Sequence, residues 1–404
     1  MSGTRFKIYL PGFDTPRTVH VRARPGTIGA GPRGRGIVVI GAIADEPAGS
    51  RRSNGARTQY KQPYKDEVTG LARSRPPWTG DRHTPAKPGP GGHFDGIRAG
   101  SRAFSAAAAF ATVRSVHDIW EGIFGRRLPW FFRKTYRHLE VIPRVASANS
   151  WSGEGFIECG FLRPRSHRGP MAENFDVVAH ETGHLILKSV IGNPADDKKT
   201  LEYRAHEEGA ADLVAFVAAM HFDDVLLRVL EETDGRLLSI NTLSRIGESR
   251  RPKLKVPRVL FHTLRLASKK VRAAWRGYDK HTYALPFSAA LFDVFNAIYQ
   301  EHLRRVGLLT GAPPRVTPAF RETLLRSQRR LPAFDEAPEA FITAARRARD
   351  DFAHLLASAW RRTRVAPFSY PRAAAAVLAA DATLYRGRHR AAIRALFRWR
   401  GIPI

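Results

Sequence analysis

Residues 177–185 constrain this chain of 404 residues more than any other part of its sequence. They read V-V-A-H-E-T-G-H-L and contain the pattern H-E-x-x-H at His180, Glu181 and His184. Residues four apart lie on one face of an α-helix, so a helix here would turn both imidazoles toward one metal ion. Glu181 lies one position further round, where it can act as general base on a metal-bound water. Apolar residues on both sides predict that this helix is buried.

A catalytic zinc ion takes three protein ligands and keeps a fourth position open for water. The segment H-E-E-G-A-A-D at 206–212, in the next predicted helix, offers the third ligand. Glu208 and Asp212 are four apart, so Glu208 could bind the ion while Asp212 accepts the distal N–H of a ligand histidine. His206 and Glu207 compete for the ligand role, but neither has an acidic partner one turn later. The expected zinc ligands are His180, His184 and Glu208.

Composition and periodicity divide the chain into four expected segments. These are a small strand-rich piece at 1–45, a Pro-, Gly- and Arg-rich linker or arm at 46–96, a catalytic lobe at 97–200 and a helical lobe at 201–404. The arm has few large apolar residues, so it cannot form a core of its own. Strand-like runs lie at 139–142 and 155–161. Helical spacing of apolar residues marks 104–124, 174–191, 205–221, 283–302, 338–360, 371–384 and 388–399.

The chain is strongly basic, with 66 Lys and Arg against 37 Asp and Glu and a net charge of +29. Such a charge would bind polyanions non-specifically at low salt. The basic residues are spread along the chain, however, and this favours an ordinary solvated surface. The single cysteine, Cys159, cannot form an internal disulfide.

No stretch has the apolar length of a signal peptide or a membrane span, and the best window, 103–113, is too short. We therefore expect no membrane span and either a cytoplasmic or a non-classically exported protein. The sequence leaves the compartment and the oligomeric state open.

The motifs resemble those of the thermolysin-like zinc metallopeptidases, the gluzincins, and most closely those of the fungalysin group. E-G-A-A-D at 208–212 is similar to that group's E-G-W-S-D, whose Glu is the third zinc ligand and whose Asp orients a ligand histidine. Asn149-Ser150-Trp151 resembles the N-A-aromatic edge strand along which these enzymes lay the substrate backbone. The resemblance implies that Asn149 and Ser150 bind substrate.

Two further segments carry the resemblance into the second half of the chain. Asp279-Lys280-His281, followed by F-S-A-A-L at 287–291, resembles the family's D-x-H and the helix after it. In the family that histidine donates a hydrogen bond to the developing oxyanion and the aspartate holds it, which implies a catalytic role for His281. A donor of this kind is worth about 3–4 kcal/mol of the barrier.

L-E-Y-R at 201–204 is similar to the family's L-x-Y-x and implies that Tyr203 contacts the substrate or its oxyanion. Tyr203 lies closer to Glu208 than the family spacing. Ala284 and Leu285 stand where the group usually has Gly and Glu, which leaves calcium binding open.

The sequence therefore predicts an α+β fold in the thermolysin manner, with a small β-containing N-terminal lobe and a mostly helical C-terminal lobe. The expected activity is zinc-dependent endopeptidase action on peptides or proteins. Two alternatives remain: a basic polyanion-binding protein whose zinc site is structural or vestigial, and a zinc hydrolase of a non-peptide amide. Glu181 argues against the first alternative, because a structural zinc needs no base and has four closed protein ligands.

Overall fold

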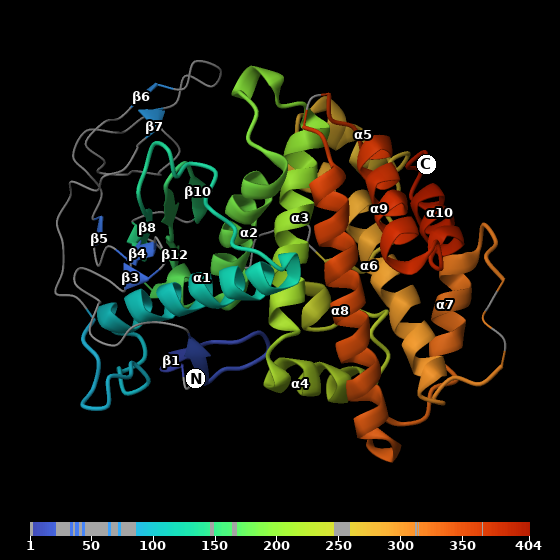
Figure 1. Cartoon of the computed structure of the whole chain (residues 1–404), viewed down its shortest axis with the longest axis horizontal. Coiled ribbons are helices and arrows are strands. Elements are labelled where there is room, and N and C mark those ends of the chain that lie inside the picture. The colour runs from blue at the N-terminus through green and yellow to red at the C-terminus, as the bar shows by residue number, and fades with distance from the viewer. Residues whose placement is uncertain are drawn as a thin grey trace. The chain divides into compact units, whose positions relative to one another are not determined.

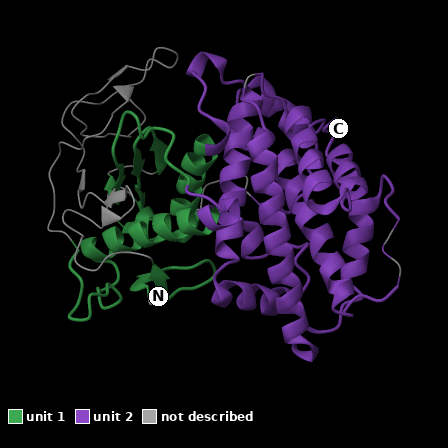
Figure 2. Ribbon diagram, viewed as in Figure 1, with its two compact units in different colours: residues 1–120, 128–189, 247–255 green, residues 121–127, 190–246, 256–404 purple. Residues whose placement is uncertain are grey.

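The computed structural model divides the chain into two compact units (Figure 2). Unit 1 comprises residues 1–120, 128–189 and 247–255, and unit 2 comprises 121–127, 190–246 and 256–404. The residues described are 3–21, 86–145, 149–163, 168–245 and 259–404 except 312, 314 and 366, with the backbone of short strands between 33 and 73. Most of the predicted arm at 46–96 lies outside them.

Unit 1 mixes strands with helices, and a five-stranded sheet is its largest sheet among the described residues (Figure 1). The strand order is β10–β11–β8–β4–β3. The bounds are β3 (Arg33–Gly34), β4 (Ile37–Val39), β8 (Leu139–Ile142), β10 (Trp151–Gly153) and β11 (Phe156–Glu158). β8 pairs in parallel with β4 and β11, and its four residues are all buried, as is usual for a strand inside a parallel sheet. β10 pairs with β11 in antiparallel fashion and ends the order.

The other strands of unit 1 form two-stranded pairs: β1–β2, β5–β9, β6–β7 and β12–β13. Their bounds are β1 (Thr4–Ile8), β2 (Arg17–Val21), β5 (Ile43–Ala44), β6 (Tyr64–Lys65), β7 (Ala72–Arg73), β9 (Arg144–Val145), β12 (Phe161–Arg163) and β13 (Arg168–Pro170). The helices of this unit are most of α1 (Arg102–Phe124), most of α2 (Phe175–Ile191) and the short η2 (Met171–Glu173). The ring of Phe6, in β1, stacks on that of Phe94 with 4.8 Å between the centroids, and its centroid lies 5.7 Å from that of Phe110 in α1. These contacts pack the β1–β2 pair on α1.

Unit 2 is built from helices around α6, which packs against α3, α5, α7, α8 and α10 (Figure 1). The helix bounds are α3 (Leu201–Ala219), α4 (Asp223–Thr233), α5 (Lys269–Arg276), α6 (Lys280–Arg305), α7 (Phe320–Gln328), α8 (Pro338–Arg362), α9 (Tyr370–Tyr385) and α10 (Arg390–Trp399). Three short helices, η3 (Asp196–Lys198), η4 (Leu243–Arg245) and η5 (Phe334–Glu336), complete the unit. The fully buried rings of Phe216, Phe295 and Phe352 meet edge to face where α3, α6 and α8 come together.

Strands and helices together confirm the predicted α+β class. Within the described part of the chain, no helix combines the length and the apolar character that crossing a membrane requires.

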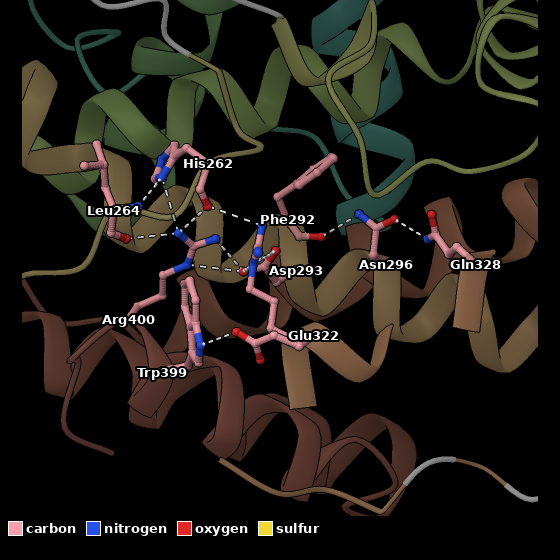
Figure 3. Close-up of polar contacts among 10 residues, drawn as sticks. His262, Leu264, Phe292, Asp293, Asn296, Glu322, Gln328, Trp399 and Arg400 are labelled. Carbon is pink, nitrogen blue, oxygen red and sulfur yellow. Dashed lines mark hydrogen bonds and ion pairs between the residues drawn. The ribbon is translucent and has the colours of Figure 1, made fainter. Parts of the chain in front are cut away.

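A buried ion cluster ties four separate segments of unit 2 to one another (Figure 3). The carboxylate of Asp293, in α6, is fully buried and accepts from the Arg321 Nε, at 3.1 Å to each oxygen. Arg400 donates to the same carboxylate through Nε at 3.2 Å and through a terminal nitrogen at 2.5 Å. Arg400 also donates to the backbone carbonyls of His262 at 2.8 Å and Leu264 at 3.0 Å. One carboxylate thus joins α6, α7, the segment before α5 and the end of the chain.

A buried carboxyl group also lies in the sheet of unit 1. Glu158, in β11, is fully buried, and neither of its carboxyl oxygens has a hydrogen-bond partner among the described residues. Burial raises the pKa of Glu158 well above its usual value. Burial therefore favours the neutral, protonated form of this side chain in the folded chain.

We predict that Asp293→Asn lowers the free energy of unfolding by about 3–5 kcal/mol, because it leaves two buried guanidinium groups without their carboxylate. Urea unfolding measures this loss. The control is Asp350→Asn, which removes a carboxylate that is 51% exposed and binds Arg349 at 2.8 Å. This exposed pair should be worth less than about 1 kcal/mol. Equal losses in the two variants would contradict the role given to Asp293.

We also predict a pH-dependent effect of Glu158→Gln. A carboxyl group whose pKa is higher in the folded than in the unfolded chain lowers the free energy of unfolding as pH rises above its unfolded pKa, about 4.3 for Glu. The variant lacks this loss, so its unfolding free energy should exceed that of the parent by an amount that grows from pH 4.5 toward neutrality. Glu154→Gln, at an exposed position nearby, should show no such trend. A constant difference across pH would show that Glu158 is not buried in neutral form.

Candidate metal centre

Helix α2 begins with a side-chain cap and is held by apolar residues on both sides of the histidine motif. The Asn174 Oδ1 accepts from the backbone N–H groups of Asp176 at 2.9 Å and Val177 at 3.3 Å, which satisfies two donors of the first turn. Thr182, inside the motif, donates its hydroxyl to the carbonyl of Val178 at 2.7 Å. The fully buried apolar residues of this helix are Val178, Ala179, Leu185, Ile186 and Leu187.

The motif residues themselves are buried: His180 is 6% exposed, and Glu181 and His184 are each 7% exposed. The Nε2 atoms of the two histidines lie 3.0 Å apart. Two nitrogen ligands on one tetrahedral zinc ion, each at about 2.0–2.1 Å, would be roughly 3.3 Å apart. The two imidazoles therefore present the same ring nitrogen at a spacing that one metal ion can bridge.

Helix α3 carries the acidic residues that the sequence singles out. The hydroxyl of Thr200 caps its start by accepting from the backbone N–H of Tyr203 at 3.1 Å. Glu208 and Asp212, one turn apart, are only 2% and 3% exposed. A Cβ at Gly209 would lie 3.1 Å from the Cβ of Ser288, so glycine here allows α3 to approach α6 closely.

The first turn of α6 places two basic side chains on the carboxylate of Glu208. The Lys280 Nζ lies 2.7 Å from Oε1, and the His281 Nδ1 lies 3.1 Å from Oε2. The side chains of Lys280 and His281 are 44% and 51% exposed, whereas that of Glu208 is 3% exposed. Asp279 caps this turn by accepting from the backbone N–H groups of His281 at 3.0 Å and Thr282 at 3.2 Å. Burial acts to raise the pKa of Asp279, but hydrogen bonds from Thr282 outweigh it and hold the pKa below its usual value.

His180, His184 and Glu208 form a buried group that could hold a metal ion. Each offers one ligand atom, and these atoms all lie within 4.8 Å of one another. Among the described residues, no other group of three or more His, Cys, Asp and Glu side chains is arranged closely enough to hold a metal ion. Two nitrogens and one carboxylate oxygen leave one position of a tetrahedral ion for water or substrate.

His206, the competing histidine of α3, has a different environment. Its ring is 2% exposed and lies 5.3 Å from the ring of Phe287 and 4.8 Å from that of Phe368. Burial lowers the pKa of His206 to about 4, so this imidazole is neutral at pH 7. His206 is therefore part of an aromatic cluster of unit 2.

Two residues expected to contact substrate have hydroxyl groups engaged within the protein. The buried Ser150 donates to the Met171 Sδ at 3.2 Å and accepts from the Gly160 N–H at 3.3 Å. Tyr203 is fully buried, and its hydroxyl donates to the carbonyl of Gly192 at 3.1 Å. Asn149 is exposed and stands two residues before β10. The substrate-binding roles of Asn149, Ser150 and Tyr203, and the orienting role of Asp212, stay predictions.

Sequence reasoning assigned no role to Lys280, although the structure places its ammonium group on Glu208. The single local signal is its position between Asp279 and His281 in the D-x-H motif. That signal does not identify Glu208 as the partner, because the two residues are far apart in the sequence.

The comparisons with known proteins assign no family to the chain. No family model matches it, and no curated protein does. The likeness to thermolysin-like enzymes therefore rests on the short motifs described above and on the chemistry of the residues in them.

We predict that the purified protein binds about one zinc ion per chain and that His184→Ala loses it, because two protein ligands hold zinc much more weakly than three. Elemental analysis after dialysis measures the stoichiometry. His354→Ala is the matched control, since His354 is an exposed histidine of α8. Retention of zinc by His184→Ala at the level of the control would show that the ligands are other residues.

Proposed function

We propose that this protein is a zinc-dependent endopeptidase of the thermolysin-like type, most similar to the fungalysin group. The observation that carries the proposal is the buried group of His180, His184 and Glu208, with Glu181 next to His180 in the same helix. Two imidazoles and one carboxylate are a donor set that suits zinc in a catalytic site. We extend the proposal to the fold, with unit 1 as the β-containing lobe and unit 2 as the helical lobe.

In this proposal Glu181 is the general base. A zinc ion in the site would supply Lewis-acid polarisation of the scissile carbonyl and of an attacking water. Glu181 accepts a proton from that water and later returns it to the leaving amine. Its burial, at 7% exposure, supports this role, because a dry site strengthens the interaction of a base with its proton donor.

His281 is the proposed hydrogen-bond donor to the oxyanion of the tetrahedral species. Its side chain is 51% exposed and lies in the first turn of α6, so a substrate can reach it. Asp279 supports this position through the backbone of the turn, because its carboxylate caps the N–H groups of His281 and Thr282.

The proposed substrate is an extended peptide that pairs with the edge of a sheet. β10 ends the strand order of the five-stranded sheet and pairs with β11 on one side. An extended peptide can add to such an edge through main-chain hydrogen bonds, which tolerate many side chains. This supports peptides and unfolded proteins as the substrate class.

We predict that Glu181→Gln keeps its zinc but loses hydrolysis of an unfolded protein by several orders of magnitude, because it removes the base and no ligand. Casein cleavage and metal content are measured on the same preparation. Glu154→Gln is the control, since Glu154 is an exposed carboxylate with no role in the mechanism. Activity of Glu181→Gln within tenfold of this control would remove Glu181 as the base, and loss of zinc would make it a ligand.

The same assay separates the two alternative functions. A zinc-loaded protein that leaves casein intact but hydrolyses a simple non-peptide amide would be an amide hydrolase of another class. A protein that binds zinc, cleaves neither and binds heparin at physiological salt would support a polyanion-binding role with a structural zinc.

A further inference from the structure

Unit 2 contains an open cavity of about 740 Å³ between α7 and α10, whose lining residues are exposed or half-buried. Its wall combines three arginines, Arg265, Arg394 and Arg398, with Trp399, Glu322 and small or apolar residues. Cavities that bind small molecules commonly have volumes of about 300–1,000 Å³, mostly apolar walls and a few polar groups. The volume and the wall therefore both fit a small organic ligand.

One face of α10 lines this cavity. The lining residues of that helix are Ala391, Arg394, Ala395, Arg398 and Trp399. Their spacing of three and four residues places them along one side of the helix. The other side is fully buried in the core through Ile393, Leu396 and Phe397. The two alanines leave space on the open side, while the two arginines, one turn apart, supply charge.

The charge of the wall is positive. The wall contains three guanidinium groups and one carboxylate, that of Glu322. The Glu322 Oε1 already accepts a hydrogen bond from the Trp399 Nε1 at 3.0 Å. The Arg394 Nε is buried and has no hydrogen-bond partner among the described residues. The Glu322 Oε2 is likewise buried without a partner among the described residues, so the wall contains both a donor and an acceptor that are not satisfied there.

The indole of Trp399 connects the wall to the buried ion cluster behind it (Figure 3). The guanidinium of Arg265 lies 4.2 Å from its ring centroid, and those of Arg400 and Arg321 lie at 4.7 Å and 4.9 Å. Two of these three cations share the single carboxylate of Asp293, so positive charge remains in excess behind the wall. The cluster therefore reinforces the positive potential of the cavity.

We propose that this cavity binds a small organic anion, with a carboxylate or phosphate group on Arg394 and Arg398 and an apolar body against Trp399 and Ala395. Arginine suits both groups because its planar guanidinium donates two parallel hydrogen bonds to either one. The concave wall selects a compact ligand, unlike the spread-out surface charge of the chain, which attracts extended polyanions without selection. The cavity shares no residue with the candidate metal centre, so this proposal does not depend on the proposed peptidase function.

The test is calorimetric titration of the full chain at physiological salt with 1-naphthyl phosphate and 1-naphthoate, which share one ring system and differ in the anionic group. At least one of them should bind saturably, with one ligand per chain, and the stronger of the two identifies the anionic group. Arg394→Gln combined with Arg398→Gln should weaken binding by roughly tenfold or more, because two charge-assisted hydrogen bonds are lost. Ala395→Leu should weaken binding too, since it fills the cavity without changing charge.

The control is Arg329→Gln combined with Arg347→Gln, which removes the same charge from two exposed positions outside the cavity wall. It should change affinity less than twofold. Thermal unfolding of each variant checks that the fold is kept. The proposal is overturned if neither compound binds saturably, if the control pair weakens binding as much as the cavity pair, or if Ala395→Leu has no effect.

Discussion

The helical unit depends on one buried carboxylate, that of Asp293. Two guanidinium groups are buried with it, and removing charges from water is favourable only where each is paired and its remaining donors are bonded. Arg400 meets that condition, because the carbonyls of His262 and Leu264 accept its other hydrogen bonds. Burial, followed by the charge of Arg400, lowers the pKa of His262 to about 3, so the imidazole adds no further positive charge to the cluster.

The same helix, α6, links this cluster to the candidate metal centre. Lys280 and His281 stand in its first turn, and Asp293 follows about three and a half turns later, roughly 18–20 Å along the axis. A helix fixed in the core at its middle holds its first turn with little freedom. This matters for the oxyanion role that we propose for His281, since a catalytic group must be held within about 0.5 Å of its working position.

Much of the secondary structure could be predicted from local patterns. The periodicity of apolar residues located α1, α2, α8, α9 and α10 to within about two residues at each end, because each of these helices buries a stripe of apolar side chains. It missed α4, α5 and α7. α5, for example, has eight residues and buries only Val271 and Ala274. The predicted strand at 155–161 is divided into β11 and β12, since the backbone N–H of Met171 pairs with the carbonyl of Gly160 between them.

The parts of the candidate site that could be predicted are likewise those whose residues lie close together in the sequence. The histidine motif and the acidic pair of α3 follow from spacing within one helix, so the sequence contains them. The cluster of Asp293, Arg321 and Arg400 and the contact of Lys280 with Glu208 join residues far apart in the chain, and no local pattern encodes them. The buried Glu158 shows only as an acidic residue between Ile157 and Cys159, which does not reveal that it lacks a partner.

The carboxylate of Glu208 takes part in two sets of electrostatic interactions. It is part of the group that could hold a metal ion, and it already neutralises the ammonium group of Lys280. A divalent ion and a lysine beside one carboxylate would repel each other, although the 44% exposure of the Lys280 side chain lets solvent screen part of this repulsion. In the metal centre proposed above, the affinity for the ion would include the free energy of weakening the contact between Lys280 and Glu208, and by reciprocity a bound ion would weaken that contact. In that proposed centre, Lys280 would compete with the ion for Glu208 and lower the metal affinity below that of the three ligands alone.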